Sequence, residues 1–372
     1  MKAITVIMKV TNNCNLQCKH CYEAEGQFKD STPIMTLGVL ENTIKKAQAE
    51  YQKVIYIWFG GEPLLAGLDF FEKAIEYQKL YTTNNIIIQN RIQTNGTKLS
   101  DEFIEFFKKN SFNVSISFDG LYNDFLRYDS NLVLDCIQRC KSKNLRVNII
   151  STICSETSDK QIENYNYFKK QGLFMKFNPI FPAGAAKKNS KYLLNEKKYI
   201  QDTKEFFKYW IDDENAIPVS SFVQYAKMYL GYGERNCIYG ACLYKVLNIE
   251  PNGTIFPCSR YSKNEYIIGS VFDFQNLSEA FKTENFNNIV LQGITRREKC
   301  KKECELYEFC SGGCSSACAN EVELSNNDTQ LCRITKEILP FVFNELDTIY
   351  KNKPIKNPIL QYLYDHLNNA IN

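Results

Sequence analysis

Residues 11–26, TNNCNLQCKHCYEAEG, place three cysteines within eight positions directly after the apolar run ITVIMKV. The thiols are those of Cys14, Cys18 and Cys21, so their spacing is C-x-x-x-C-x-x-C. An apolar, β-branched run of this length is typical of a buried strand. The cysteines therefore fall on the loop that leaves the carboxyl end of a first strand.

Outward from this loop, strand-like and helix-like segments alternate as far as about residue 213. Amphipathic stretches at 36–51, 68–81 and 100–110 separate the strand-like runs. Those runs are ITVIMKV, VIYIWF, IIIQNRI, NVSISF, LRVNIIST and LFMKFNP. Six strands separated by helices predict an α/β fold with a parallel sheet, as an open sheet or a partial barrel. In such folds ligands gather at the carboxyl ends of the strands, where the three cysteines lie.

The composition fits a globular protein of 372 residues, 44% hydrophobic and 23% charged. A formal net charge of +3 gives no reason to expect a nucleic-acid or anionic membrane partner. The amino-terminal residues lack the pattern of a signal peptide, and no apolar run reaches the ~20 residues of a membrane span. We therefore expect a cytoplasmic protein.

Fifteen cysteines and two histidines restrict the chemistry of the chain. An odd number of thiols cannot pair completely, and disulfides are rare in a reducing compartment, so metal ligation is the remaining explanation. Structural zinc needs four ligands, and the front loop offers three thiols. Three thiolates on a cubane iron–sulfur cluster would leave one iron open to a substrate or cofactor.

The front loop resembles that of the radical SAM enzymes, and the resemblance covers essentially the whole catalytic core. It implies a partial (β/α)6 TIM barrel and a [4Fe–4S] cluster held by Cys14, Cys18 and Cys21. The open iron of this cluster would chelate the amino and carboxylate groups of S-adenosylmethionine (SAM). One electron into the sulfonium would then give methionine and a 5′-deoxyadenosyl radical, chemistry that belongs to the cofactor.

Three further motifs carry the same resemblance: FGGEP at 59–63, QTNG at 93–96 and SISFDG at 115–120. In the family the glycine-rich segment meets the methionine amino group, because bare backbone allows close approach and a carboxylate can accept from the ammonium. His20 holds the position beside adenine that is usually aromatic. The SAM-binding residues that the resemblance implies are His20, Gly60, Gly61, Glu62, Ser117 and Arg127.

Nine cysteines lie between residues 237 and 332, in a region that resembles the SPASM extension of peptide-modifying radical SAM enzymes. The run at 242–258 predicts a hairpin with Asn252 and Gly253 at its turn. CKKEC at 300–304 is one residue longer than the C-x-x-C of the family. Alone, these cysteines would suit two structural zinc ions equally well. The resemblance implies two auxiliary [4Fe–4S] clusters, one on Cys237, Cys242, Cys258 and Cys314 and one on Cys300, Cys304, Cys310 and Cys332.

Fully ligated auxiliary clusters would accept the electron that remains after hydrogen abstraction. If Cys237 is not a ligand, the auxiliary cluster expected on Cys242, Cys258 and Cys314 would have an open iron that could hold a substrate thiolate. Of the other thiols, Cys318 is an alternative that could replace one of the expected ligands, and Cys136, Cys140 and Cys154 are expected to be buried in the core.

The expected domains are a radical SAM barrel at 1–213, a bridging segment at 214–236, a SPASM domain at 237–335 and a helical tail at 336–372. Within the tail, Pro340 predicts a kink or a break.

The function that the sequence favours is that of a radical SAM peptide maturase, which oxidises or crosslinks a ribosomally made peptide. The alternative is an anaerobic sulfatase-maturating enzyme, which oxidises Cys or Ser to formylglycine. In that family an Asp, thought to be the base, follows the cysteine matching Cys258, but here the residue is Ser259. A serine hydroxyl cannot take up a proton near neutral pH without a partner base. A second alternative is a non-catalytic iron–sulfur electron carrier.

The partners expected are a peptide or protein substrate and a low-potential electron donor. Because only thirteen residues precede Cys14, recognition of a leader peptide is expected elsewhere, for instance on a separate protein. No catalytic base is singled out: near the expected site lie Tyr22, Glu23, Gln93 and Ser259.

Overall fold

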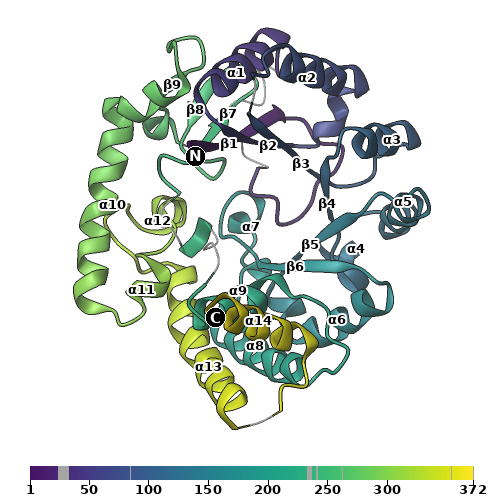
Figure 1. Cartoon of the computed structure of the whole chain (residues 1–372), viewed down its shortest axis with the longest axis vertical. Helices are drawn as coiled ribbons and strands as arrows, with labels where there is room; N and C mark the ends of the chain where they lie inside the picture. The colour runs from purple at the N-terminus through teal and green to yellow at the C-terminus, as the bar shows by residue number, and fades with distance from the viewer. Residues whose placement is uncertain are drawn as a thin grey trace. The chain divides into compact units, whose positions relative to one another are not determined.

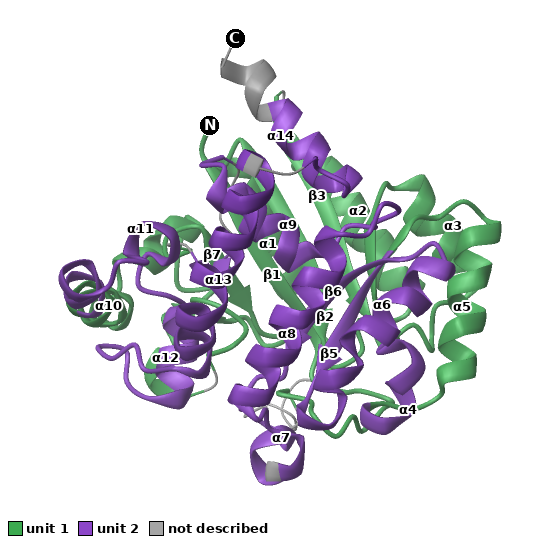
Figure 2. Ribbon diagram, turned by 90° about the horizontal axis from the view of Figure 1, so that it is seen from below, with its two compact units in different colours: residues 1–117, 127–147, 242–295 green, residues 118–126, 148–241, 296–372 purple. Residues whose placement is uncertain are grey.

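The computed structural model describes residues 1–23, 33–83, 85–232, 237–239, 242–261, 263–352 and 354–371. The chain forms two compact units (Figure 2). Unit 1 comprises residues 1–117, 127–147 and 242–295, and unit 2 comprises residues 118–126, 148–241 and 296–372. The domain bounds expected from the sequence remain a prediction. Residues 24–26 of the cysteine-rich stretch and 233–236 of the expected bridging segment lie outside the described residues.

Unit 1 is built on a sheet in which the strands follow the order β4-β3-β2-β1-β7-β8-β9. The strands are β1 (Ala3–Thr11), β2 (Lys53–Gly60), β3 (Ile87–Thr94), β4 (Asn113–Ser117), β7 (Val246–Ile249), β8 (Thr254–Phe256) and β9 (Gly269–Ser270). Pairing is parallel from β4 to β7 and antiparallel for β8 and β9. The parallel sheet expected from the alternating pattern is therefore present.

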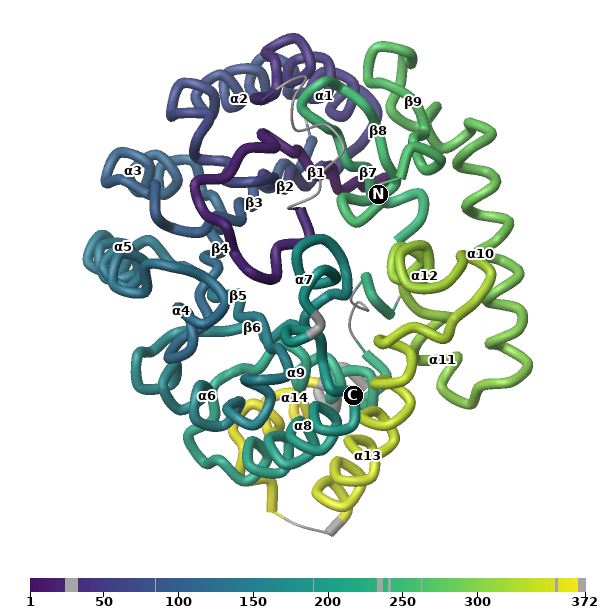
Figure 3. The backbone as a smooth tube through the Cα atoms, turned by 180° about the vertical axis from the view of Figure 1, so that it is seen from behind, coloured from purple at the N-terminus to yellow at the C-terminus, as the bar shows by residue number. Residues whose placement is uncertain are grey.

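The helices of unit 1 are α1 (Leu37–Glu50), η1 (Pro63–Ala66), α2 (Leu68–Leu80), α3 (Asp101–Lys109), α5 (Ser130–Ser142), η6 (Asn264–Tyr266), η7 (Leu277–Lys282) and the first part of α10 (Glu284–Glu303). Of these, α1, α2, α3 and α5 lie along the outer side of β1 to β4, as Figures 1 and 3 show. Two of these helices begin at a residue whose side chain caps the first turn: Thr36 caps α1 and Ser100 caps α3. The core that they cover includes Trp58, which packs edge-on against Phe71 with 5.8 Å between ring centroids.

The hairpin predicted at residues 242–258 is confirmed, with Gly253 at a φ of +91° between β7 and β8. The sequence does not reveal that its first strand extends the parallel sheet. β7 pairs with β1, so that Met8 lies opposite Ile249. This register brings residues just before Cys14 beside residues that precede Cys258.

Unit 2 combines the parallel pair β5 (Val147–Ile153) and β6 (Phe174–Pro179) with a helical layer. Its helices are η2 (Gly120–Tyr122), α4 (Asn123–Leu126), η3 (Ser155–Lys160), α6 (Gln161–Lys170), α7 (Ala185–Lys188), η4 (Ser190–Tyr192), α8 (Glu196–Ile211), α9 (Ser220–Tyr229), η5 (Cys237–Tyr239), α11 (Tyr307–Cys310), α12 (Ser315–Glu321), α13 (Gln330–Asn352) and α14 (Pro358–Ile371), with the end of α10. The aromatic side chains of Phe206, Trp210 and Phe222 are buried where α8 and α9 meet.

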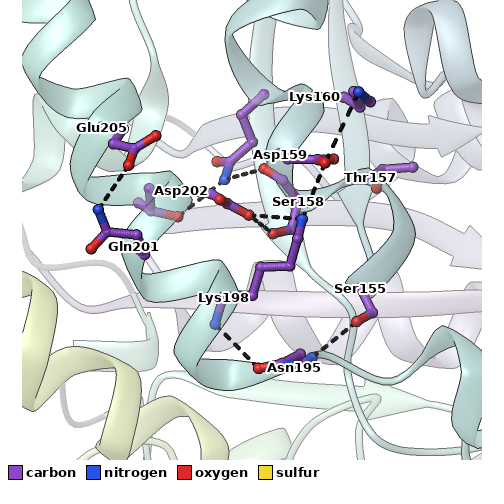
Figure 4. Close-up of polar contacts among 12 residues, drawn as sticks. Ser155, Thr157, Ser158, Asp159, Lys160, Asn195, Lys198, Gln201, Asp202 and Glu205 are labelled. Atoms are coloured by element: carbon purple, nitrogen blue, oxygen red, sulfur yellow. Dashed lines mark hydrogen bonds and ion pairs between the residues drawn. The ribbon is translucent and has the colours of Figure 1, made fainter.

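Polar contacts fasten η3 to α8 (Figure 4). The hydroxyl of Ser158 donates to Asp202, and Lys198 Nζ lies 3.2 Å from Asp202 and 3.3 Å from Asp159. Asn195, the cap of α8, accepts from the backbone N–H of Lys198. The turn that leaves β5 is thereby held to the start of the helical layer.

α13 continues through Pro340, so the helix does not break there, and the alternative of a kink at this residue stays a prediction. Proline removes one backbone donor from a helix, and packing of α13 on α8 and α9 offsets that loss. No helix in the part of the chain described here has the length and apolar character needed to cross a membrane.

Candidate functional site

The three front cysteines lie on one loop at the carboxyl end of β1. Cys14 is exposed, Cys18 and Cys21 are half-buried, and none of the three takes part in a disulfide. The backbone N–H of Cys21 donates to the carbonyl of Cys18 at 3.2 Å. Burial raises the pKa of the Cys21 thiol to about 11. A bound metal cation reverses that preference, because ligation deprotonates thiols, and a set of three soft donors fits an iron–sulfur cluster.

The end of β2 packs directly on the backbone that leads into this loop. Gly61 N donates to Thr11 O, and Glu62 N donates to Asn13 O, each at 2.8 Å. A Cβ atom on Gly60 would lie 2.3 Å from Thr11 O, and one on Gly61 would lie 2.0 Å from Asn13 O. The glycines therefore admit the backbone of the cysteine loop itself. Their contact with SAM remains a prediction.

Replacing Gly61 by Ala is expected to displace the loop that carries Cys14, because the new methyl group would overlap the Asn13 carbonyl. Such overpacking costs about 1–3 kcal/mol. The variant should lose front-cluster iron and SAM cleavage, measured by iron analysis and 5′-deoxyadenosine release after anaerobic reconstitution. Gly38→Ala, whose added Cβ would meet no atom closer than 3.9 Å, is the matched control. Full iron and normal cleavage in Gly61→Ala would contradict the expectation.

Glu62 is a fully buried carboxylate that joins the ends of β2 and β3. Its Oε1 accepts from Leu64 N at 3.0 Å and from Thr94 Oγ1 at 2.7 Å, and its Oε2 accepts from Asn95 N at 2.7 Å. Burial raises the pKa of Glu62 to about 7, although these hydrogen bonds oppose the shift. Both oxygens are thus engaged within the chain, and a contact with the SAM ammonium remains a prediction.

The raised pKa of Glu62 gives the stability of the protein a pH dependence with a defined sign. The folded state holds this proton more tightly than the unfolded chain, so the contribution of Glu62 is fully present below its ordinary pKa of 4.5 and is lost as pH rises through about 7. A shift of this size corresponds to roughly 3 kcal/mol. Glu62→Gln should remove that part of the slope in denaturation curves measured from about pH 4 to about pH 8. The exposed Glu72→Gln serves as a control, and equal slopes in Glu62→Gln and wild type would refute this assignment.

The QTNG segment at the end of β3 also fastens the cysteine loop. Asn95 Nδ2 donates to Asn15 Oδ1 at 3.0 Å and lies 3.9 Å from Cys14 Sγ. Asn15 Nδ2 in turn donates to Thr97 Oγ1 at 2.8 Å. The position of this motif after a strand is visible in the sequence, but its contact with the loop is not.

The other predicted SAM contacts also belong to unit 1. Ser117 is buried at the end of β4, and His20 and Arg127 are half-buried. Their contacts with SAM remain predictions.

A buried lysine holds two carboxylates beside the cysteine loop. Lys9 Nζ, on β1, lies 2.7 Å from Glu23 Oε2 and 3.2 Å from Glu250 Oε2. Burial would lower the pKa of Lys9, but the charges of Glu23 and Glu250 outweigh it and raise the pKa. Asn248 Nδ2 donates to the other Glu250 oxygen at 2.9 Å. Sequence reasoning missed Lys9 and Glu250, although a lysine inside an apolar strand signals a buried partner.

The remaining base candidates differ in their surroundings. Tyr22 is stacked on Phe59, with 6.2 Å between ring centroids, and burial raises its pKa well above the usual range. Gln93, on β3, and Ser259, beside Cys258, are half-buried. The structure does not single out one of them as the base.

Unit 2 brings together the thiols of one expected auxiliary cluster. They come from α10, the turn after it, α11 and α13, and they are Cys300, Cys304, Cys310 and Cys332. Burial and the charges of the other three thiols together raise the pKa of Cys310 to about 11. Asn327 Nδ2 also donates to Cys300 Sγ at 2.9 Å. Four soft donors within electrostatic reach of one another fit an iron–sulfur cluster.

The second expected set is divided between the units, with Cys242 and Cys258 in unit 1 and Cys237 and Cys314 in unit 2, and remains a prediction. Cys318 is buried on α12. Among the described residues, no group of three or more His, Cys, Asp or Glu side chains is placed to hold a single metal ion. The expected burial of the three remaining cysteines is confirmed for Cys136, Cys140 and Cys154.

Comparison with known families accounts for both groups of cysteines. The model of the radical SAM superfamily matches residues 8–166, and the SPASM iron–sulfur cluster-binding domain matches residues 237–314. This chain is a radical SAM enzyme with a SPASM domain. The two matches include the front loop and seven of the nine rear cysteines; Cys318 and Cys332 lie beyond them.

This radical SAM enzyme is 29% identical to the cysteine-type anaerobic sulfatase-maturating enzyme of Clostridium novyi, over 94% of the chain and 98% of the relative. It is 27% identical to the enzyme of the same description from Clostridium perfringens, over 95% of the chain and 100% of the relative. The solved structure of anSMEcpe with bound AdoMet and Cp18Cys peptide matches with a TM-score of 0.82 at 26% identity, covering 94% of this chain and 99% of that one.

These matches confirm the α/β radical SAM partial barrel with a C-terminal SPASM domain. The protein is an enzyme that modifies a peptide, so the non-catalytic electron carrier is set aside. Its cofactors are SAM and [4Fe–4S] clusters, including auxiliary clusters of the SPASM domain. A total of three clusters remains a prediction.

Proposed function

We propose that this radical SAM enzyme oxidises a cysteine side chain of a peptide or protein to formylglycine, as anaerobic sulfatase-maturating enzymes do. The similarity to cysteine-type relatives along nearly the whole of both chains carries the proposal. It supports this alternative more directly than the crosslinking maturase that the sequence favours. The solved relative with AdoMet and a Cp18Cys peptide supports a peptide substrate here.

In this proposal the front thiols hold the cluster and the ends of β2 and β3 hold the loop in place. Bound SAM and its cluster would supply a 5′-deoxyadenosyl radical that removes a hydrogen atom from the substrate. The substrate thiol must lose its proton to a base, and one further electron must leave, for which the auxiliary clusters are the proposed acceptors. Hydrolysis of the resulting thioaldehyde would give the aldehyde and hydrogen sulfide.

The test uses a peptide whose cysteine carries deuterium on Cβ, incubated anaerobically with reconstituted enzyme, SAM and reductant. The proposal predicts deuterium in the released 5′-deoxyadenosine, and none when the labelled cysteine is replaced by alanine. Release of unlabelled 5′-deoxyadenosine with the labelled peptide unchanged would refute abstraction at this carbon.

One observation keeps crosslinking as a second candidate function. Ser259 stands where the sulfatase-maturating pattern has its Asp, and a serine hydroxyl is not a base near neutral pH. A crosslink would join the cysteine sulfur to a carbon of the same peptide and keep the sulfur in the product. The two functions are therefore separated by whether sulfur leaves the peptide.

A further inference from the structure

Arg296 is a fully buried arginine in unit 2, on the part of α10 that leads to Cys300. Its Nε donates to Gly312 O at 2.9 Å, its Nη1 to Leu324 O at 2.5 Å and its Nη2 to Ser315 Oγ at 2.8 Å. Each acceptor is neutral. Within the described residues, no carboxylate forms an ion pair with this guanidinium.

A buried charge without an opposite charge is strongly unfavourable, since neutral acceptors replace only part of the lost hydration. Arginine remains protonated in proteins, so it cannot relieve this cost by losing its proton. An opposite charge nearby would offset this cost. An anion is therefore expected close to Arg296.

Arg296 contacts the segments that follow two expected cluster ligands, Cys310 of the set in unit 2 and Cys314 of the set divided between the units. Cys300 lies four residues further along the same helix, which places it on the same face one turn away. Gly312 follows Cys310 by two residues, so the guanidinium ties the segment after Cys310 to the helix that carries Cys300. A [4Fe–4S] cluster with four thiolate ligands is an anion, and it would supply the missing negative charge.

We propose that Arg296 is the buried counter-charge of the auxiliary cluster on Cys300, Cys304, Cys310 and Cys332. Its positive charge stabilises the reduced cluster, which carries one more negative charge than the oxidised cluster. Arg296 thereby makes this cluster a better electron acceptor. The inference rests on the predicted ligand set and not on formylglycine chemistry, so it can fail while the proposed function stands.

The experiment is a redox titration followed by electron paramagnetic resonance, in a Cys14→Ala, Cys18→Ala, Cys21→Ala background that lacks the front cluster. In Arg296→Gln we expect the ratio of reduced to oxidised cluster at a fixed potential to fall about tenfold or more. Lys301→Gln removes an exposed charge from the same helix and should leave the ratio nearly unchanged, because solvent screens it.

An unchanged ratio in Arg296→Gln with iron retained would overturn the proposal. If that variant does not retain the cluster, Arg296→Lys decides the question. Lysine keeps the positive charge but cannot donate the three hydrogen bonds that the guanidinium makes. A ratio close to that of the parent protein then supports a role of the charge. A tenfold fall of the ratio in Arg296→Lys would overturn the proposal, because the hydrogen bonds of Arg296, and not its charge, would then set the ratio of reduced to oxidised cluster.

Discussion

Replacing Cys14, Cys18 and Cys21 by Ala is expected to abolish SAM cleavage while the rear iron remains bound. The three thiols lie on one loop after β1, and the rear cysteines of unit 2 share no ligand with them. Loss of the front cluster should remove about four iron atoms per chain. Iron and sulfide analysis, with 5′-deoxyadenosine measured under reducing conditions, gives both readouts.

The matched control removes three other thiols, in Cys136→Ala, Cys140→Ala, Cys154→Ala. These side chains are fully buried, so their loss should lower the free energy of unfolding without changing cluster iron per folded chain. SAM cleavage by the front triple variant would show that the site is assigned to the wrong residues.

Lys9→Met is the single substitution expected to reduce stability most. The lysine neutralises Glu23 and Glu250, and its side chain is 7% exposed. Removing one partner of a buried ion pair costs about 3–5 kcal/mol, because the remaining charge is left in a poorly solvated place. Denaturation should show this loss, and the displaced Glu23 should disturb the adjoining Cys21, so that front-cluster iron also falls.

A surface pair near the amino terminus is the comparison for Lys9. Lys2 Nζ lies 2.8 Å from Glu50, but its side chain is 53% exposed, so Lys2→Met should cost at most about 1 kcal/mol. Adding Glu23→Gln and Glu250→Gln to Lys9→Met should recover part of the lost stability, because no buried charge then remains unpaired. If Lys9→Met and Lys2→Met lower the free energy of unfolding by the same amount, the buried ion pairs of Lys9 do not stabilise the fold.

The structural features that the sequence predicts correctly are those that depend on residues close together in the chain. All six expected strands are present, and the hairpin turn at Gly253 follows from its Asn-Gly pair. The spacing of Cys14, Cys18 and Cys21 indicates the family that the match of the radical SAM model to residues 8–166 confirms. These signals are local because strand alternation, turn residues and ligand spacing each act over a few positions.

The features that the sequence does not reveal depend on pairing between distant segments. The parallel pairing of β7 with β1 creates the Lys9–Glu250 contact. No pattern near either residue in the sequence indicates that the two are partners. The burial of Arg296 likewise depends on a loop that folds back over α10. The family resemblance explains the glycines at 60 and 61 by an approach to SAM, whereas the structure explains them by backbone packing on Thr11 and Asn13.

The central claim, oxidation of cysteine to formylglycine, is tested most directly by the mass of one peptide product. A sulfatase-type peptide with a single cysteine is incubated anaerobically with reconstituted enzyme, SAM and reductant, and then analysed by high-resolution mass spectrometry. The account predicts a product in which oxygen has replaced sulfur and two hydrogen atoms have been lost. A product that has lost two hydrogen atoms but keeps its sulfur would contradict it and identify a crosslinking maturase.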